Sequence, residues 1–227
     1  MRKASYALTA LAAVFITILN ILALTRVDWS VPRTHSFPFL TAPRVVATYK
    51  SGALNSTLEA KYGLKTVCTR LEINLPGGSR YEKPNCRAFP TRGDDYCDEE
   101  NSTFCALWSS AEYATEVAIG FGALALVAIA VGVSTHSRRR RIWRAVAGLV
   151  AVQALLQVTA FAIVVDQYRM ARYPTFEDAL LGPGLWLTTV AWILGVLTTS
   201  ATVVTGLAAD RGKKWAAGRR AYEPILG

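Results

Sequence analysis

The chain has 227 residues, of which 52% are hydrophobic and 18% are charged. A soluble globular domain carries about 25% charged residues, so this composition argues against an ordinary cytosolic enzyme. The net charge of +9 and the isoelectric point of about 9.6 would suit a nucleic-acid-binding protein. We exclude that class because the basic excess is confined to segments beside apolar runs and accompanies no nucleic-acid-binding fold.

Four apolar runs without charged residues predict four transmembrane helices. Each run is long enough to cross about 30 Å of hydrocarbon, which takes roughly 20 helical residues. The predicted segments, in chain order, are a first transmembrane helix over 1–25, an extracellular loop over 26–113, a second helix over 114–136, a basic cytoplasmic turn over 137–141, a third helix over 142–165, a short extracellular loop over 166–184, a fourth helix over 185–209 and a cytoplasmic tail over 210–227.

A cleaved signal peptide is the alternative interpretation of the first run, because Arg2 and Lys3 precede it. The run is longer than the apolar region of a typical signal peptide, which has about 7–15 residues. In addition, no A-x-A cleavage site follows it. We therefore expect a retained helix.

The basic residues predict which side of the membrane each loop faces. The segments before the first span, between the second and third spans and after the fourth span contain 12 Lys and Arg and two acidic residues, whereas the large loop contains 11 basic and 10 acidic residues. Lys and Arg favour the cytoplasm, so both termini are expected there. The turn carries a basic cluster expected to face anionic lipid: Arg138, Arg139, Arg140, Arg141 and Arg144.

The large loop contains every cysteine and both N-glycosylation sequons of the chain. These residues are Cys68, Cys86, Cys97 and Cys105, and the acceptors Asn55 and Asn101. Paired cysteines and glycan acceptors indicate an oxidising compartment, which agrees with the charge bias. A zinc site is the competing interpretation, but gaps of 17, 10 and 7 residues lack the short cysteine pairs that zinc sites use. The sequence therefore predicts a disulfide-braced glycoprotein.

One pairing of the cysteines is favoured by a predicted hairpin. Side chains over residues 65–73 alternate as in a strand, and the Pro-Gly-Gly-Ser segment at 76–79 is typical of a turn. If a second strand runs back from a turn centred on residue 77, Cys86 lies opposite Cys68. Opposed residues have Cα atoms about 4.5–5.5 Å apart, within disulfide range. The other two cysteines would then pair, while the two alternative connectivities stay open.

A tryptophan soon after the first span, a Gly-Leu pair and a following cysteine resemble the pattern of the claudin family. The matching residues are Trp29, Gly63, Leu64 and Cys68, with Cys86 in the place of the second cysteine. The motif covers about residues 29–86, and the four-span topology extends the resemblance along the chain.

The chain departs from claudins at Lys65, which stands in place of the motif's tryptophan, and in its extra cysteines Cys97 and Cys105. It more closely resembles the divergent claudin-like membrane proteins of fungi, which include eisosome-associated and PalI-type pH-response groups. The resemblance implies a left-handed bundle with a small outer sheet and a role at the cell surface. The expected fold is an all-α transmembrane four-helix bundle with a small antiparallel β-sheet in a large, disulfide-braced first extracellular loop.

Several residues are expected to have structural roles only. Trp108 and Trp186 are placed in the interfacial belt or facing lipid, and Trp143 is placed beside the cytoplasmic basic cluster as an anchor. Gln153 and Gln157 share one face of the third helix and are expected to hydrogen-bond across the bundle. Small residues at four-residue steps in the second and fourth spans allow helices to approach closely, in this chain or between chains.

The sequence shows no arrangement suited to catalysis. It has two histidines, His35 and His136, and no span carries an acid and a base that could act together. The acidic residues between Asp94 and Glu100 could attract calcium, although a solvated loop is the commoner meaning of such a run. We expect a protein that is not an enzyme and that has no cofactor and no metal.

These features predict a multi-pass protein that organises the plasma membrane or cell surface. Its expected partners are membrane lipids, other membrane proteins or further copies of itself laterally, and wall or cell-surface material outside, with no nucleic acid. An accessory or sensor subunit of a membrane signalling complex, similar to a pH-response complex, is the alternative. A channel or transporter subunit is disfavoured, because the spans contain neither a Gly/Pro-broken helix pair nor an array of buried charges.

Overall fold

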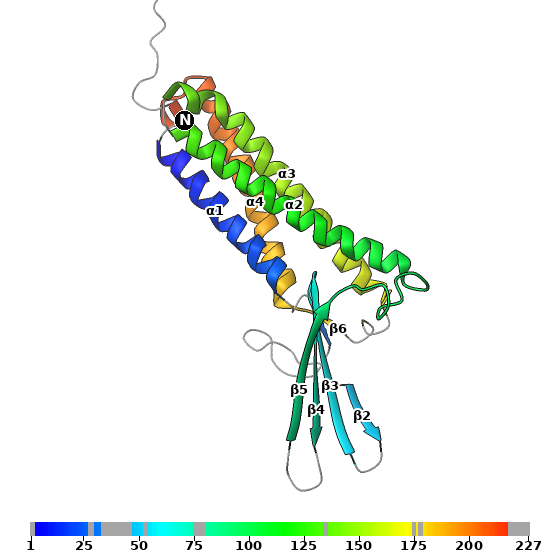
Figure 1. The fold of residues 1–227 in the computed structure, drawn as a ribbon. Helices are drawn as coiled ribbons and strands as arrows, with labels where there is room; N and C mark the ends of the chain where they lie inside the picture. Colours follow the sequence, from blue (N-terminus) through cyan, green and yellow to red (C-terminus); the bar gives the residue numbers. More distant parts are fainter. Residues whose placement is uncertain are drawn as a thin grey trace, which may run out of the picture. The chain divides into compact units, whose positions relative to one another are not determined.

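The computed structural model describes residues 3–26, 30–32, 47–51, 54–74, 80–133, 136–173, 176 and 179–217. In this part of the chain, four helices are long and apolar enough to span a membrane. They are α1 (Lys3–Thr25), α2 (Ser102–Val133), α3 (His136–Arg169) and α4 (Pro183–Asp210), and the short helix α5 (Lys214–Ala217) follows (Figure 1). The chain is therefore a multi-pass membrane protein, as the apolar runs predict.

Two of the spanning helices extend beyond the bounds expected from hydropathy. The second begins at Ser102 rather than at 114, and the third includes the segment 137–141, where a turn was predicted. Hydropathy locates only the residues that lie in hydrocarbon, whereas a helix can continue into water wherever tertiary contacts bury one of its faces. With 32 residues, α2 is about 48 Å long, well above the roughly 30 Å of a hydrocarbon core.

Within the described ranges, six short strands form one antiparallel sheet. They are β1 (Ser30–Pro32), β2 (Ala47–Ser51), β3 (Leu54–Tyr62), β4 (Thr66–Asn74), β5 (Arg80–Ala88) and β6 (Ala179–Leu181). The order is β5-β4-β3-β1-β6, with β2 also paired to β3 (Figure 1). The strand β6 lies in the segment before α4, where the sequence predicts a short loop over 166–184, and it joins the sheet by pairing with β1.

The predicted hairpin is confirmed. Strands β4 and β5 pair with Cys68 opposite Cys86, and Thr66 opposite Ala88 at the end of the ladder. This register follows from the turn position, because paired positions in a hairpin are equidistant from its centre. The turn residues 75–79 lie outside the described part of the chain.

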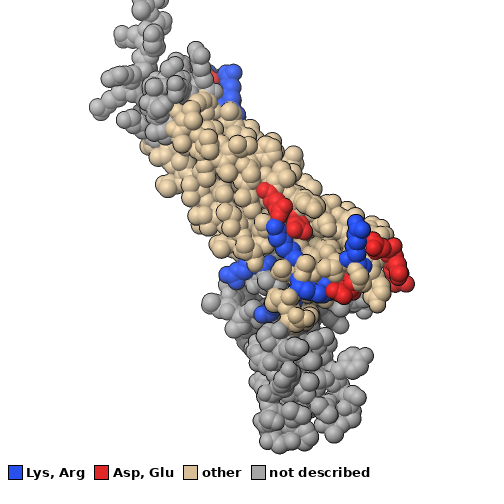
Figure 2. Space-filling view, in the orientation of Figure 1, with Lys and Arg blue, Asp and Glu red and all other residues tan. Residues whose placement is uncertain are grey.

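The chain divides into two compact units, which we describe separately. The bundle unit comprises Met1–Ile21, Thr115–Val158 and Thr189–Gly227, and it contains the greater part of all four spans. The sheet unit comprises Leu22–Ala114 and Thr159–Thr188, and it contains the strands and the remaining helix ends. Each unit has its own cluster of buried apolar side chains. Figure 2 shows a face of the bundle unit with almost no charged side chains, as contact with hydrocarbon requires.

Candidate functional site

Two disulfides brace the sheet unit. Cys68 and Cys86 are joined across β4 and β5, with Cα atoms 4.1 Å apart. Cys97 and Cys105 are joined with Cα atoms 5.7 Å apart, which ties the segment after β5 to the first turns of α2. Both pairings agree with the hairpin prediction, and no cysteine in the described residues is free.

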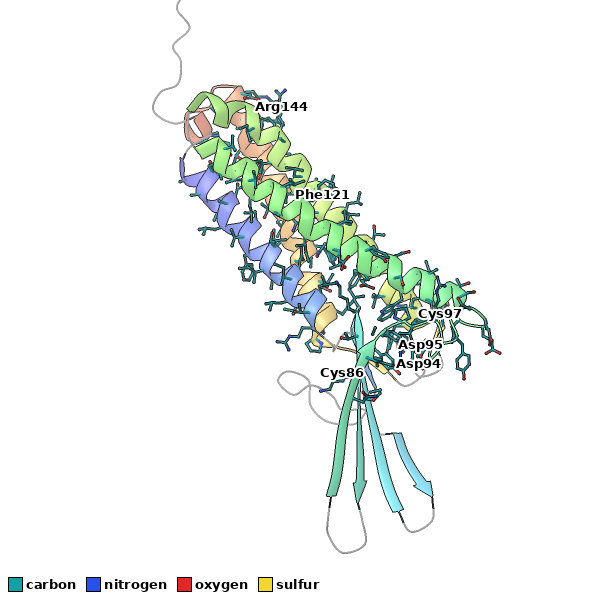
Figure 3. All side chains as sticks on the ribbon, viewed as in Figure 1. Cys86, Asp94, Asp95, Cys97, Phe121 and Arg144 are labelled. Atoms are coloured by element: carbon teal, nitrogen blue, oxygen red, sulfur yellow. A yellow bond between two sulfur atoms is a disulfide. The ribbon has the colours of Figure 1, made fainter. Side chains whose placement is uncertain are left out.

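A buried carboxylate, Asp95, is the centre of a polar cluster in the sheet unit (Figure 3). The Arg87 guanidinium donates from Nη1 to Oδ2 at 2.7 Å and from Nη2 to Oδ1 at 2.6 Å. The Tyr173 hydroxyl donates to Oδ1 at 2.8 Å, and the backbone N–H of Thr91 donates to Oδ2 at 2.7 Å. We call these four residues the Asp95 cluster. Because Asp95 is only 1% exposed, its charge depends on these donors.

The Asp95 cluster joins three segments that are distant in the sequence. Arg87 lies at the end of β5, Thr91 and Asp95 follow the cis peptide bond between Phe89 and Pro90, and Tyr173 lies between α3 and β6. The bidentate contact between Arg87 and Asp95 fixes orientation as well as distance. The Asp95 cluster therefore links the segment between α1 and α2 to the segment between α3 and α4.

The hydrogen bonds within the Asp95 cluster favour the ionised form of the Asp95 carboxylate. Burial alone would raise the pKa of Asp95, but the hydrogen bonds from Arg87, Thr91 and Tyr173 outweigh it and lower the pKa from 3.8 to about 2. The hydrogen bond to Asp95 raises the pKa of Arg87, against the opposing effect of burial. Burial and the hydrogen bond to Asp95 raise the pKa of Tyr173. Neither the carboxylate nor the phenol is poised to exchange a proton near neutral pH.

The turn that carries Asp95 is closed by Asn101, one of the two predicted glycan acceptors. Its Nδ2 atom donates to the Asp95 carbonyl at 2.9 Å, and its backbone N–H donates to the carbonyl of Tyr96 at 3.1 Å. The Asn101 carbonyl in turn accepts from the N–H of Cys105 at 2.9 Å. The Asn101 side chain is half-buried at the start of α2, next to the exposed Ser102 and Thr103 of its sequon.

An aromatic cluster forms the core of the sheet unit. Phe104 and Tyr173 stack with ring centroids 4.7 Å apart, and Phe89 meets Trp108 edge-on at 5.6 Å. Such pairs contribute about 0.5–1.5 kcal/mol each beyond the burial of their area. All six rings are at least nine-tenths buried: Tyr62, Phe89, Phe104, Trp108, Tyr173 and Phe176.

Trp108 is a structural residue that sequence reasoning placed wrongly. It is fully buried in the sheet unit rather than facing lipid, and its indole N–H donates to the Leu64 carbonyl at 3.2 Å. The sequence contains a pattern that predicts the burial of Trp108, because Phe104, Cys105, Trp108 and Ala111 recur with helical spacing. All four side chains are buried in the structure. That pattern extends the second helix into the large loop.

The Gly-Leu pair of the family motif lies in the turn between β3 and β4. The N–H of Gly63 donates to the Thr66 carbonyl at 2.8 Å, which closes the turn, and Leu64 is fully buried. The remaining motif residue, Trp29, lies outside the described residues, and the acceptor Asn55 lies in β3. The structure thus gives the Gly-Leu pair a packing role within the sheet unit.

In the bundle unit, the small residues of the spans pack against helices of the same chain. A Cβ on Gly195 of α4 would lie 2.9 Å from the Cβ of Ala154 in α3, and one on Gly206 would overlap the Trp143 ring. On α2, a Cβ on Gly132 would collide with the Tyr6 side chain of α1. Gly132, Gly195 and Gly206 are therefore used for contacts within the bundle.

The position of Trp143 corrects a second expectation. Its side chain is 5% exposed and packs against Gly206 inside the bundle unit, instead of anchoring at the membrane surface. The neighbouring Arg144 is exposed, with its guanidinium carbon 5.5 Å from the Trp143 ring centroid and its Nη2 atom 3.4 Å from Asp210 (Figure 3). Arg138–Arg141 of the predicted basic cluster lie in the first turns of α3.

Two shallow apolar grooves flank α4 in the bundle unit. The first, of about 240 Å³, lies between α1 and α4 and is lined by residues including Thr9, Ala12 and Ala201. The second, of about 260 Å³, lies between α3 and α4 and is lined by residues including Ala151, Leu155 and Ser200. Small side chains on α4 create both grooves, since they leave space between helices that larger residues would fill.

The acidic cluster of the large loop is divided by the fold. Asp95 is drawn into the interior, whereas Asp94, Asp98, Glu99 and Glu100 are exposed. The carboxylate of Asp94 lies 3.8 Å from Nε of Arg87. No group of three His, Cys, Asp or Glu side chains in the described ranges is arranged to hold a metal ion.

The fold and these contacts define a class: a four-span membrane protein with a disulfide-linked antiparallel sheet built largely from the segment between its first two spans. No protein-family model matches the chain, and the comparison with curated proteins finds no similar sequence. Its function must therefore be argued from its own residues.

Proposed function

We propose that this protein is a claudin-like, non-enzymatic organiser of the plasma membrane, with both termini in the cytoplasm and the glycosylated sheet unit outside. It associates laterally through its spans and contacts neighbouring ectodomains or wall material through the sheet unit. The positive charge of the segments around Arg138–Arg141 supports this orientation, as do the two disulfides. The Gly-Leu turn at Gly63 supports the relationship to claudins and to their fungal relatives.

The observation that carries this proposal is the pair of grooves beside α4. Gly195 and Gly206 of α4 are occupied by contacts within the chain, whereas the two grooves are open apolar surfaces on this helix, and the exposed Leu197 lines the first of them. Association in a membrane depends on close packing and on small residues, which this surface provides. The partner is a span of another membrane protein or of a second copy. In the unassociated protein, lipid chains fill the grooves.

The ionisable groups of the sheet unit support a structural role over catalysis. Arg87, Asp95 and Tyr173 bond to one another, and their pKa values are shifted away from neutrality. A general acid or base works best with a pKa near the operating pH. These groups stabilise the fold and leave its surface to make contacts.

Filling a groove tests the proposal. Ala201→Phe fills the groove between α1 and α4, and Val127→Phe on the exposed face of α2 is the matched control. We expect the fluorescently tagged chain to form slowly diffusing patches in the plasma membrane, Ala201→Phe to disperse them, and Val127→Phe to leave them unchanged. Photobleaching recovery measures the mobile fraction. Uniform, freely diffusing wild-type protein would contradict the proposal.

The signalling alternative has one observation in its favour. Trp215 of α5 is 52% exposed directly after α4, beside Lys213. An exposed aromatic next to a basic residue suits contact with a cytosolic partner. Loss of one receptor's surface delivery on deletion of the protein, without loss of surface patches, would favour this role.

A further inference from the structure

Three basic side chains are exposed at the end of the bundle unit where α4 finishes. They are Arg144 of α3, whose side chain is 74% exposed (Figure 3), and Arg211 and Lys213, which directly follow α4. The carboxylate of Asp210 lies 3.4 Å from Arg144 Nη2 and offsets one of the three positive charges. With three positive charges and one negative charge, these four residues carry a net charge of +2.

A glycine cap turns the chain back onto the bundle unit after α4. Gly212 has a φ of 71°, in the left-handed region, and its N–H donates to the Ala209 carbonyl at 3.1 Å. The N–H of Lys213 donates to the Ala208 carbonyl at 3.0 Å, which completes a Schellman cap. In the short helix α5, Ala216 is 3% exposed and belongs to the same buried apolar cluster as Ala208 and Ala209. The turn therefore keeps α5 beside the last residues of α4.

This turn also places an exposed tryptophan at the level where the apolar span ends. Trp215 directly precedes the buried Ala216 and is itself 52% exposed. The charge-free run of α4 ends at Ala209, and Ala216 packs in the cluster that contains this residue. Tryptophan favours the boundary between hydrocarbon and water, where its ring contacts lipid and its N–H meets polar groups. Trp215 is therefore held at the depth of the lipid headgroups rather than in bulk water.

The charges beside Trp215 select the kind of lipid that fits this surface. Guanidinium and ammonium groups donate charge-assisted hydrogen bonds to phosphate oxygens. A zwitterionic lipid carries its own cation next to the phosphate, so a lipid with a net negative charge gains most from the excess of positive charge. Each basic residue near a membrane surface increases the affinity for anionic lipid about fivefold. An acidic cytosolic protein would match the charge but would not explain a tryptophan held at the depth of the headgroups.

We propose that Arg144, Arg211, Lys213 and Trp215 form a binding site for an anionic phospholipid at the end of α4. The basic groups bind the phosphate, and the Trp215 ring lies beside the glycerol and the first carbons of the acyl chains. The helix α5 thereby rests on the membrane surface. The site is independent of the lateral association proposed above, and its affinity for lipid can be measured whichever way the chain crosses the bilayer.

Native mass spectrometry of the full chain in detergent, titrated with phosphatidylserine or phosphatidylcholine, tests the charge preference. Arg211→Gln combined with Lys213→Gln removes two charges from the site, and Arg92→Gln combined with Arg169→Gln removes two exposed charges from the sheet unit as the matched control. We expect phosphatidylserine to bind more tightly to the wild type, and the site pair to lose about fivefold in affinity per charge while the control pair keeps it. Equal affinities for the two lipids, or equal losses in the two pairs, would overturn the proposal.

The depth of the Trp215 ring separates a lipid site from a protein-binding site. In lipid nanodiscs, subtracting the fluorescence of Trp215→Phe from that of the wild type isolates the Trp215 signal, and a change at this half-exposed position should leave the fold intact. We expect strong quenching by phospholipid brominated near the start of its acyl chains and weak quenching by aqueous iodide. Quenching by iodide alone would place the ring in water, favour a cytosolic protein partner and refute the lipid site.

Discussion

Trp108 and Leu64 are joined by a hydrogen bond across 44 residues of sequence: the indole N–H of α2 donates to the carbonyl in the β3–β4 turn at 3.2 Å. This bond connects the first turns of a spanning helix to the sheet. It also places the Gly-Leu motif against the aromatic core, where Leu64 and Trp108 are both fully buried. The motif therefore matters for the packing of the sheet unit rather than as an exposed contact.

Removing the Trp108 indole should destabilise the sheet unit. Trp108→Phe loses the hydrogen bond and leaves the Leu64 carbonyl unpaired, which costs about 1–3 kcal/mol. Trp108→Ala adds a cavity and should cost about 3–5 kcal/mol. Chemical denaturation of the purified protein in detergent measures both changes. Trp186→Phe, at a position 67% exposed, is the control and should be nearly neutral; equal effects at the two tryptophans would contradict the packing role.

Asp95 should make the sheet unit sensitive to acid. Its pKa is lowered from 3.8 to about 2 in the folded protein, so its stabilising contribution is complete above pH 4 to 5 and is lost as the pH falls through about 2. Asp95→Asn should reduce stability at pH 7 by about 2–4 kcal/mol and remove this acid sensitivity. Unfolding followed from pH 7 to pH 2 gives both values. The exposed neighbour provides the comparison, since Asp94→Asn should leave the profile unchanged.

The two disulfides should contribute unequally to the stability of the sheet unit. Cys68–Cys86 closes 18 residues and Cys97–Cys105 closes 8, so chain entropy predicts contributions of about 3 and about 2.5 kcal/mol. Paired Cys→Ser variants, compared by resistance to protease, should follow this order. Peptide mapping without reduction checks the connectivity, and a peptide joining Cys68 to Cys97 or Cys105 would be incompatible with the hairpin.

Gly206→Ala should disrupt the packing of α4 on α3. The added methyl overlaps the Trp143 ring, a bulky buried side chain that has little room to move, and overpacking of this kind costs about 1–3 kcal/mol. Gly148→Ala is the matched control, because its methyl meets open space and alanine favours a helix. Thermal unfolding in detergent should separate the two variants, with only Gly206→Ala lowering the transition temperature.

Orientation can be tested with the two sequons. Asn55→Gln and Asn101→Gln should each remove one glycan and raise electrophoretic mobility, because the proposed orientation exposes both sites to glycosyltransferases. Enzymatic deglycosylation should bring the wild type and both variants to the same mobility. An absence of glycan at both positions, together with cleavage at Arg138–Arg141 by protease added outside the cell, would reverse the topology.

The four spans and the β4–β5 hairpin could be predicted from the sequence because both depend on local patterns. A run of about 20 apolar residues is sufficient to specify a span, and a turn centred on residue 77 places Cys68 opposite Cys86 whatever surrounds it. The pairing of Cys97 with Cys105 then follows from the hairpin.

Only the tertiary structure decided what the buried side chains contact. Tyr173 reaches Asp95 from 78 residues away, and Trp143 turns inward onto Gly206, although a tryptophan beside basic residues resembles a surface anchor. Burial in these cases is set by neighbours from distant segments, and no local periodicity encodes those neighbours. The sequence alone determined where the chain crosses the membrane, and long-range packing determined which polar and aromatic residues became its interior.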